Sequence, residues 1–316
     1  MSFRHLPILI RELDRHALKR DDSVWTNEQL YQSETRILAR WKNRYPTDEQ
    51  GHIQLLSKID VEWLTSEHLT YFFLGEVESD HGNHMLFTTE ITTPQSDLDH
   101  WLGLRHTPLD DPSTSLLFYA QALLNWQKES SFCSRCGSPL VNHDGGNRQI
   151  CGNSQCELEV FPRINPAVIV LLTHDDQCLL AHARKFQGDI PMHSCLAGFM
   201  ETGEDFEQTL RREMYEEVGV HLDEIIYKGN QPWPFPQSLM IGFHASTTNK
   251  ELTFHDGEIT SATWFTVEDL HSAVLKNMIR LPSPKSISYY LVQDWFDERS
   301  DTPLADVIAE AKKQKD

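Results

Sequence analysis

The clearest pattern in the chain is a continuous apolar run, AVIVLL at residues 167–172, followed by a polar turn at 174–176 and a second run, CLLAHA, at 178–183. Short apolar runs bounded by turn residues are typical of strands that are buried on both faces. The pattern therefore predicts a hairpin of two buried strands. Residues 238–245 and 261–265 predict further strands.

An amphipathic stretch runs from Asp205 to Val218 and ends at Gly219. This layout predicts a helix closed by glycine, because glycine tolerates the left-handed conformation of a helix C-cap. Residues 286–296 follow the helix-breaking Pro282 and Pro284 and predict a closing helix. The second half of the chain is thus expected to combine buried strands with at least two helices.

The first third of the chain has weaker patterns. Residues 26–45 predict a helix, residues 71–78 and 84–91 predict the two strands of a hairpin, and residues 116–127 predict a second helix. The apolar residues at helical spacings in the first of these segments are Leu30, Ile37, Leu38 and Trp41. The mixture indicates an α+β N-terminal domain.

Length and charge narrow the classes of function. With 316 residues, the chain is long enough for two domains and a small third. Its 28 Lys and Arg residues against 47 Asp and Glu residues give a formal net charge of −19. Such an excess repels phosphate backbones, which argues against generic coating of nucleic acid. An anionic substrate would therefore need local cations or metal ions.

Patterns typical of membrane-spanning and signal segments lead to an expectation about location. No run approaches the roughly 18 apolar residues of a membrane-spanning helix, and the first ten residues lack the layout of a signal peptide. In a reducing compartment, a cluster of cysteines indicates a metal site rather than disulfides. We therefore expect a cytoplasmic protein that does not contact a membrane.

Four of the six cysteines form two pairs separated by residues 137–150. They are Cys133, Cys136, Cys151 and Cys156. Four thiolates in two knuckles can close a tetrahedral Zn²⁺ site with no open position, which is structural chemistry. Gly137 and Gly152 are suited to the tight turns of such knuckles. Four unrelated buried cysteines are the alternative interpretation.

Three glutamates, Glu213, Glu216 and Glu217, stand at i, i+3 and i+4 of the helix expected at 205–218. Their carboxylates then project from one face, where like charges repel by a few tenths of a kcal/mol per pair. Carboxylate oxygens suit Mg²⁺ or Mn²⁺, which can neutralise a pyrophosphate and activate water. A solvated acidic face is the simpler explanation for these three residues alone.

The surrounding segment, Gly198 to Val220, resembles the whole Nudix box. Its matching positions are Gly198, Glu204, Arg212, Glu213, Met214, Glu216, Glu217, Gly219 and Val220. The resemblance implies an α/β/α sandwich with a mixed sheet that hydrolyses a nucleoside diphosphate linked to another moiety. It also implies metal binding and catalysis by the three glutamates. Arg212, counted among the catalytic residues, and Glu204 would hold the loop and helix in place.

Two further metal ligands are implied by the same resemblance. One is the main-chain carbonyl of Ala197, just ahead of the box glycine, and the other is Glu258, which precedes the strand expected at 261–265. The ions would be Mg²⁺ or Mn²⁺. A surface glutamate beside a turn is the alternative for Glu258.

A proline-rich segment, QPWPFPQS, follows the box. Together with the expected zinc ribbon, it resembles the NADH pyrophosphatase branch of the Nudix hydrolases, whose marker is QPWPFPxS. The substrate-binding residues implied are Phe161, Phe199, Gln231, Pro232, Trp233, Pro234, Phe235, Pro236, Gln237 and Ser238. The aromatic rings among them could stack on a base or simply pack in the core. Position 161 is usually Tyr in this branch. Arg105 is either the counterpart of an arginine that contacts substrate or, the simpler explanation, an ordinary surface arginine.

By this resemblance, the substrate is NAD(H), which is cleaved at its pyrophosphate to nicotinamide mononucleotide and AMP, and NAD caps of RNA are a further substrate. We expect an α+β N-terminal domain at 1–130, a zinc ribbon at 131–160 and the Nudix domain at 161–316. The family also implies a homodimer. The sequence has no G-x-G-x-x-G fingerprint of the kind a dehydrogenase uses.

Alternatives remain open at this point. One is hydrolysis of ADP-ribose or another dinucleotide, and the other is a module that binds nucleic acid or senses nucleotide without catalysis. RNA as substrate would predict a basic path near Arg135, Arg148 and Arg163.

Overall fold

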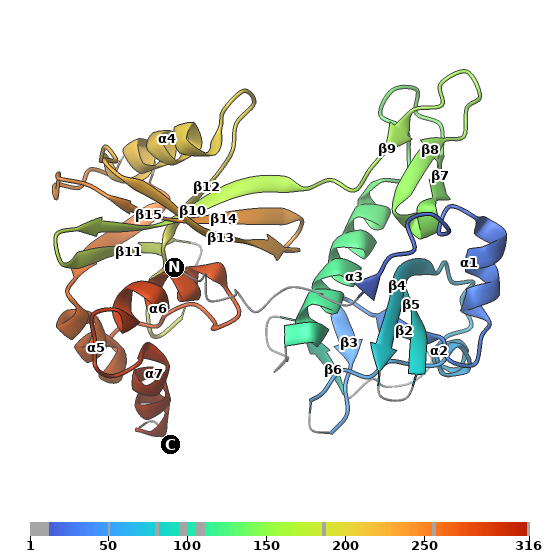
Figure 1. Cartoon of the computed structure of the whole chain (residues 1–316), viewed down its shortest axis with the longest axis horizontal. Coiled ribbons are helices and arrows are strands. Elements are labelled where there is room, and N and C mark those ends of the chain that lie inside the picture. The colour runs from blue at the N-terminus through green and yellow to red at the C-terminus, as the bar shows by residue number, and fades with distance from the viewer. Residues whose placement is uncertain are drawn as a thin grey trace. The chain divides into compact units, whose positions relative to one another are not determined.

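A computed structural model describes residues 13–49, 51–79, 82–94, 100–104, 111–184, 188–254 and 257–314 (Figure 1). The chain divides into two units. The N-terminal unit holds Pro7–Ile164 together with Trp233–Gln237, and the C-terminal unit is built from Asn165–Pro232 and Ser238–Asp316. Arg105 lies outside the described residues.

The C-terminal unit is built on a six-stranded sheet. Its strands are β10 (Asn165–His174), β11 (Gln177–Ala183), β12 (Leu196–Phe199), β13 (Ile225–Trp233), β14 (Ser238–Ser246) and β15 (Ile259–Phe265). The order is β13-β14-β10-β11-β15, and β12 pairs with β10 off this path. Since β10 runs parallel to β14 but antiparallel to β11 and β12, the sheet is mixed. The hairpin expected from the two apolar runs is β10–β11.

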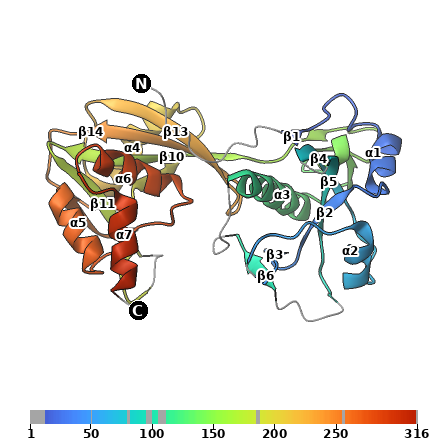
Figure 2. The same cartoon turned by 60° about the horizontal axis from the view of Figure 1, so that its bottom comes forward.

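Both faces of this sheet are covered, which explains why the sequence of β10 is apolar without interruption. Val168 and Val170 contribute to the core beneath helix α4 (Phe206–Val218). Ile169 and Leu171 belong to the opposite core, which is shared with helices α5, α6 and α7. Figures 1 and 2 show these helices on the face of the sheet opposite α4. Those helices are α5 (Val267–Leu275), α6 (Ile287–Asp297) and α7 (Leu304–Lys313). The expected α/β/α sandwich is confirmed.

Helix α4 begins and ends where the sequence predicts. Asp205 is its N-cap and forms a capping box with Gln208, and Gly219 closes it with a φ of 75°. Leu210 and Met214 are fully buried against the sheet, and Glu217, on the same side of the helix, is buried as well. Glu216 is exposed. Helix α6 likewise begins after Ser286, which caps it.

The N-terminal unit contains a four-stranded sheet of order β1-β4-β5-β2. Its strands are β1 (Leu13–Asp14), β2 (Arg36–Arg40), β4 (Phe72–Ser79) and β5 (Gly82–Glu90), and β3 (Arg44–Pro46) pairs with β6 (Trp101–Gly103). Helix α3 (Asp111–Glu129) packs on one face, while α1 (Ser23–Leu30) and α2 (Lys58–Leu64) cover the other. The hairpin at 71–91 and the helix at 116–127 are confirmed as β4–β5 and α3.

The prediction of a single helix at residues 26–45 is wrong. Helix α1 starts earlier, behind the N-cap Asp22, and ends at Leu30, after which residues 36–40 form β2. This strand pairs in parallel with β5, and Ile37 and Leu38 enter the cores on opposite faces of the sheet. Apolar residues at these positions fit a helix as well as a strand, and the pairing with β5, fifty residues away, decides between them.

The cysteine-containing segment forms a three-stranded sheet of order β7-β8-β9, preceded along the chain by α3. Its elements are β7 (Leu140–His143), the short 3₁₀ helix η1 (Asp144–Gly146), β8 (Arg148–Cys151) and β9 (Glu159–Val160). Asn147 donates a hydrogen bond to the Phe73 carbonyl and accepts one from Tyr119. This segment therefore packs on β4 and α3 within the N-terminal unit.

In the described part of the chain, no helix combines the length and the apolar character that crossing a membrane requires.

Candidate active site and metal centres

Strand β12 and helix α4 bring the first and middle parts of the Nudix box into contact. A Cβ atom at position 198 would lie 1.8 Å from Cδ of Glu213 and 2.1 and 2.2 Å from its carboxylate oxygens. Any side chain at this position would displace that carboxylate. The glycine is therefore required because the Glu213 side chain lies directly on the backbone of β12.

Arg212 ties the loop between β12 and α4 to the helix. Its guanidinium donates to Glu204 over 2.6 and 3.0 Å and to the carbonyl of Phe199 over 2.9 Å. The hydrogen bond from Arg212 is the main cause that lowers the pKa of Glu204 to about 2. Arg212 and Glu204 thus hold the loop and helix together, as the sequence predicts, and leave neither charge unpaired.

Arg212 also contacts two of the candidate metal ligands. It donates to Glu213 over 2.9 Å and to Glu216 over 3.0 Å. Hydrogen bonds to these acids, first of all to Glu204, raise the pKa of Arg212. Burial raises the pKa of Glu213 and outweighs the opposing effect of Arg212.

The three glutamates of α4 differ in exposure. The side chain of Glu216 is 54% exposed and that of Glu213 is 13% exposed, while Glu217 is buried, with 7% of its surface accessible. Their carboxylates do not all lie within 4.8 Å of one another, in contrast to two other groups among the described residues. The carboxylates stay apart because their negative charges repel one another and because Glu213 and Glu216 accept hydrogen bonds from Arg212.

The donor set nevertheless fits a hard divalent cation. All the side-chain donors are carboxylate oxygens, which Mg²⁺ and Mn²⁺ prefer. Ala197 is exposed on β12, immediately before Gly198. Glu258 is exposed ahead of β15, and its carbonyl accepts a hydrogen bond from the Arg184 amide. Metal binding by these residues stays a prediction.

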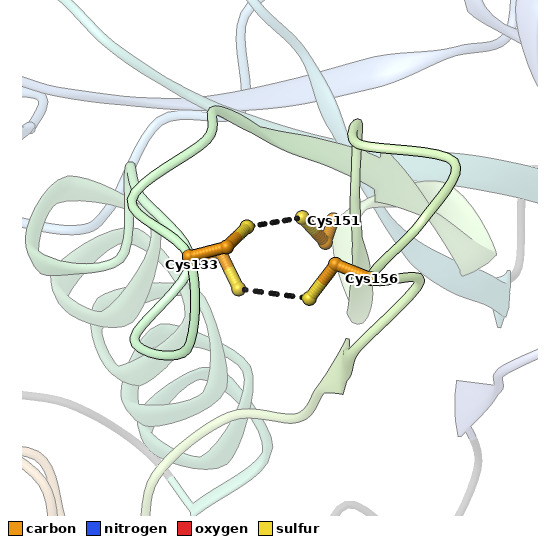
Figure 3. A group of neighbouring side chains, drawn as sticks. Cys133, Cys151 and Cys156 are labelled. Carbon is orange, nitrogen blue, oxygen red and sulfur yellow. Dashed lines mark hydrogen bonds between the residues drawn. The ribbon is translucent and has the colours of Figure 1, made fainter.

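The four clustered cysteines converge on one centre (Figure 3). The sulfur atoms of Cys133 and Cys156 lie 3.8 Å apart, and those of Cys136 and Cys151 lie 3.4 Å apart. A tetrahedron with Zn–S bonds of about 2.3 Å has edges of about 3.8 Å. The separations exceed a disulfide bond of about 2.05 Å. The cluster is therefore compatible with zinc.

The two knuckles of this cluster turn differently. Gly137 follows Cys136 with a φ of 74°, whereas after Cys156 the left-handed residue is Glu157, with a φ of 44°. Gly152 forms a bend but is not left-handed, and the turn of the second knuckle lies at residues 154–156. Hydrogen bonding by Ser138 is the main cause that lowers the pKa of Cys136 to about 6, which favours the thiolate form that binds metal.

The QPWPFPQS segment forms the end of β13, a turn at residues 234–237 and the start of β14. Trp233 and Phe235 pack edge-on against Phe118 of α3, with ring centroids 6.1 and 5.9 Å apart. Both rings are partly buried in the core of the N-terminal unit. Core packing is thus one role of this pair, and contact with substrate stays a prediction.

Asn125 of α3 holds this turn and was not found from the sequence. Its amide donates to the carbonyls of Pro234 and Pro236 over 3.3 and 2.9 Å, and its oxygen accepts from Arg40 over 2.7 Å. More than one hundred residues separate Asn125 from the turn, so no local pattern signals the contact.

Gln231, at the start of the QPWPFPQS segment, also positions a neighbouring loop. Its side chain is fully buried. The amide nitrogen donates to the Lys285 carbonyl over 2.6 Å, and the oxygen accepts from the Ile287 amide over 2.7 Å. Gln231 therefore anchors the loop that leads into α6.

The other predicted substrate residues vary in accessibility. Phe161 and Phe199 are 59% and 57% exposed, which leaves both rings open to a ligand. Pro232 and Pro236 are also exposed, Gln237 is half-buried, and Pro234 and Ser238 are buried. Phe199 follows Gly198 directly on β12, and its carbonyl accepts a hydrogen bond from Arg212.

The basic path considered for RNA is not open at Arg148. Its guanidinium pairs with Asp21, Asp144 and Glu159 over 3.2, 3.3 and 2.7 Å. These contacts join the cysteine-containing segment to the residues before α1. They neutralise the positive charge of Arg148 within the protein.

Comparison with known proteins places these features in a family. The NUDIX domain model matches residues 163–287. A NAD-capped RNA hydrolase NudC from Pseudomonas syringae pv. syringae (strain B728a) is 38% identical over 205 residues, covering 64% of this chain and 69% of that protein. The NudC of Pseudomonas fluorescens (strain Pf0-1) is 35% identical over 240 residues, covering 75% and 83%. That of Mycobacterium bovis (strain BCG / Pasteur 1173P2) is 37% identical, covering 71% and 74%. The chain therefore belongs to the Nudix hydrolases, in the branch of the NudC proteins.

Proposed function

We propose that this protein hydrolyses the pyrophosphate of NAD(H) to nicotinamide mononucleotide and AMP, and that it removes NAD caps from RNA by the same reaction. The observation that carries the proposal is similarity to proteins named NAD-capped RNA hydrolase over 240 residues. This length exceeds the Nudix match at 163–287, so the relationship extends beyond the hydrolytic domain.

The reaction adds water across one P–O–P linkage. The water oxygen forms a bond to one phosphorus, the bond from that phosphorus to the bridging oxygen breaks, and the bridging oxygen leaves with the other phosphate. Two phosphate monoesters result, and protons pass to the solvent. When bound, Mg²⁺ or Mn²⁺ would neutralise the phosphate oxygens and lower the pKa of water.

The residues of this chain would divide the work. Glu213, Glu216 and Glu217, with the Ala197 carbonyl and Glu258, would hold the divalent ions. Arg212 keeps the Glu213 and Glu216 side chains at the end of β12 through the hydrogen bonds described above. Phe199, exposed beside Gly198, would stack on a base of the substrate, as aromatic side chains do in nucleotide sites.

The four cysteines would bind one structural Zn²⁺, because their sulfur separations match the edges of a zinc tetrahedron. We place the protein in the cytoplasm, where a reducing environment keeps such thiolates available. We also infer a homodimer from the family resemblance; sedimentation equilibrium would test it.

The proposed substrate is tested by measuring hydrolysis of NADH, ADP-ribose and NAD-capped RNA at equal concentration, with the products identified by mass spectrometry. We expect nicotinamide mononucleotide from NADH and from the capped RNA. A clear preference for ADP-ribose would overturn the assignment. Binding of NADH without metal-dependent release of AMP would instead favour a sensing module.

A further inference from the structure

The turn at residues 234–237 leaves the C-terminal sheet at the end where Phe199 is exposed. It connects β13 to β14, and Ser238, the first residue of β14, pairs with Asn165 at the start of β10. Two residues further along β10, Ala167 pairs with β14 on one side and with Phe199 of β12 on the other. Neighbouring strands lie about 4.8 Å apart. The turn therefore follows the course of β14 out of the same end of the sheet as the exposed Phe199 ring.

Helix α3 holds this turn through residues on one of its sides. Phe118, Asn125 and Glu129 lie seven and four residues apart, which places them on one face of a helix. The Phe118 ring packs against the two aromatic rings of the proline-rich segment. The Asn125 amide donates to two carbonyls of the turn over 3.3 and 2.9 Å, and Glu129 accepts a hydrogen bond from Gln237 over 3.5 Å. Asn125 thus provides the direct hydrogen bonds from α3 to the backbone of the turn.

The groups behind Asn125 fix the orientation of its amide. Its oxygen accepts from Arg40 over 2.7 Å and from the Gln121 side chain over 3.0 Å. A guanidinium only donates and a carbonyl only accepts, so the Asn125 oxygen faces Arg40 and its NH₂ group faces the turn. Arg40 is 1% exposed and pairs with Glu90, while Tyr45 donates to Gln121 over 3.1 Å. A buried network of this kind keeps the two donors in place before any ligand binds.

We propose that Asn125 is a positioning residue for the dinucleotide substrate. By fixing the backbone of the turn at residues 234–237, it holds the turn beside the base on which Phe199 would stack. The inference rests on the proposed function. Asn125 acts through the turn and touches neither substrate nor metal ion. A turn that is already ordered does not have to be ordered when substrate binds, so the loss of Asn125 acts on the affinity for substrate.

The test compares steady-state hydrolysis of NADH by wild type, Asn125→Asp and Asn125→Ser, with Asn27→Asp as the matched control. Aspartate has the shape of asparagine and still accepts from Arg40, but it places an acceptor instead of a donor 2.9 Å from the Pro236 carbonyl. Serine keeps an acceptor, adds no charge and cannot donate to both carbonyls, because it has a single O–H. Asn27 is exposed on α1, so Asn27→Asp adds the same charge away from the turn.

We expect both Asn125 variants to raise KM about fivefold or more, because each loses hydrogen bonds to the turn. Asn125→Asp should be the more severe, since its carboxylate repels the carbonyls. The change in kcat should be smaller, and isothermal titration with Mn²⁺ should give the wild-type affinity, because the predicted metal ligands are unchanged. Asn27→Asp should match wild type in every measurement. A wild-type KM in both Asn125 variants, or a loss of Mn²⁺ affinity in both, would overturn the role of Asn125.

Thermal unfolding and a double variant separate positioning of the turn from a general structural role. At least one Asn125 variant should unfold near the wild-type temperature, and a large fall in both would assign Asn125 to stability of the fold instead. Phe199→Ala combined with Asn125→Asp should raise KM by less than the product of the two separate effects, because both act on one base. A full product would overturn the shared base. Absence of NADH and capped-RNA hydrolysis in wild type would overturn the proposed function itself, whereas normal hydrolysis with an unchanged KM in the variants would overturn only this inference.

Discussion

The backbone of Gly198 and the carboxylate of Glu213 occupy adjoining space, so that a single added methyl group would lie 1.8 Å from the carboxyl carbon. The contact joins two parts of the box that are fifteen residues apart in sequence. It explains in physical terms why position 198 of β12 must be a glycine, since its φ does not require one. A side chain at position 198 would therefore disturb the proposed metal ligand Glu213 without disturbing the core of the fold.

Gly198→Ala should therefore keep the fold and lose turnover. The displaced atoms are the end of a flexible glutamate side chain, which can rotate away at little cost to stability. The displaced carboxylate would no longer hold its metal ion, and we expect kcat to fall at least about tenfold. Hydrolysis of NADH and circular dichroism measure the two effects. Wild-type turnover of Gly198→Ala would show that catalysis does not require the Glu213 carboxylate to lie against β12.

Glu217→Gln should remove most turnover while the protein stays folded. The change deletes one charge from the proposed metal site without changing the volume of this buried side chain. Isothermal titration with Mn²⁺ should show weaker binding in parallel. Glu207→Gln, in the first turn of α4 and outside the carboxylate trio, is the control. Full activity of Glu217→Gln at saturating Mg²⁺ would contradict the assigned role.

Cys136→Ser should lose zinc and destabilise the N-terminal unit. Structural zinc contributes its binding free energy to folding, so a lost thiolate ligand weakens the β7–β9 sheet. We expect about one zinc per chain in wild type, less in the variant, and a lower unfolding temperature. Arg135→Ala changes an exposed neighbour in the same knuckle and should retain the metal. Equal zinc content in both variants would refute a four-cysteine site.

Glu204 should make stability depend on pH in acid. Its pKa falls from an ordinary value of 4.5 to about 2 in the folded protein, chiefly through Arg212. The carboxylate therefore stabilises the fold fully above pH 4.5, and this contribution is lost as the pH falls through about 2. Urea unfolding should show Glu204→Gln less stable than wild type at pH 7, with a difference that shrinks towards pH 2. A difference that does not change with pH would contradict the linkage.

The local signals of the sequence determined the hydrolytic half of the protein. The uninterrupted apolar run of β10 and the capped amphipathic stretch of α4 each carry their structure in nearby residues. The box and cysteine motifs likewise have short, fixed spacings. Such features depend on periodicity and local hydrogen bonding, which a sequence displays directly.

Tertiary structure decided the contacts between distant segments. Residues 36–40 became a strand because β5 offers a partner, although their spacing also suits a helix. Asn125 is hydrogen-bonded to the proline turn, and Gln231 is hydrogen-bonded to the loop that contains Lys285. Both contacts join residues more than fifty positions apart in the sequence. Side chains that meet only after folding leave no periodic trace, because their packing depends on the whole chain rather than on neighbouring residues.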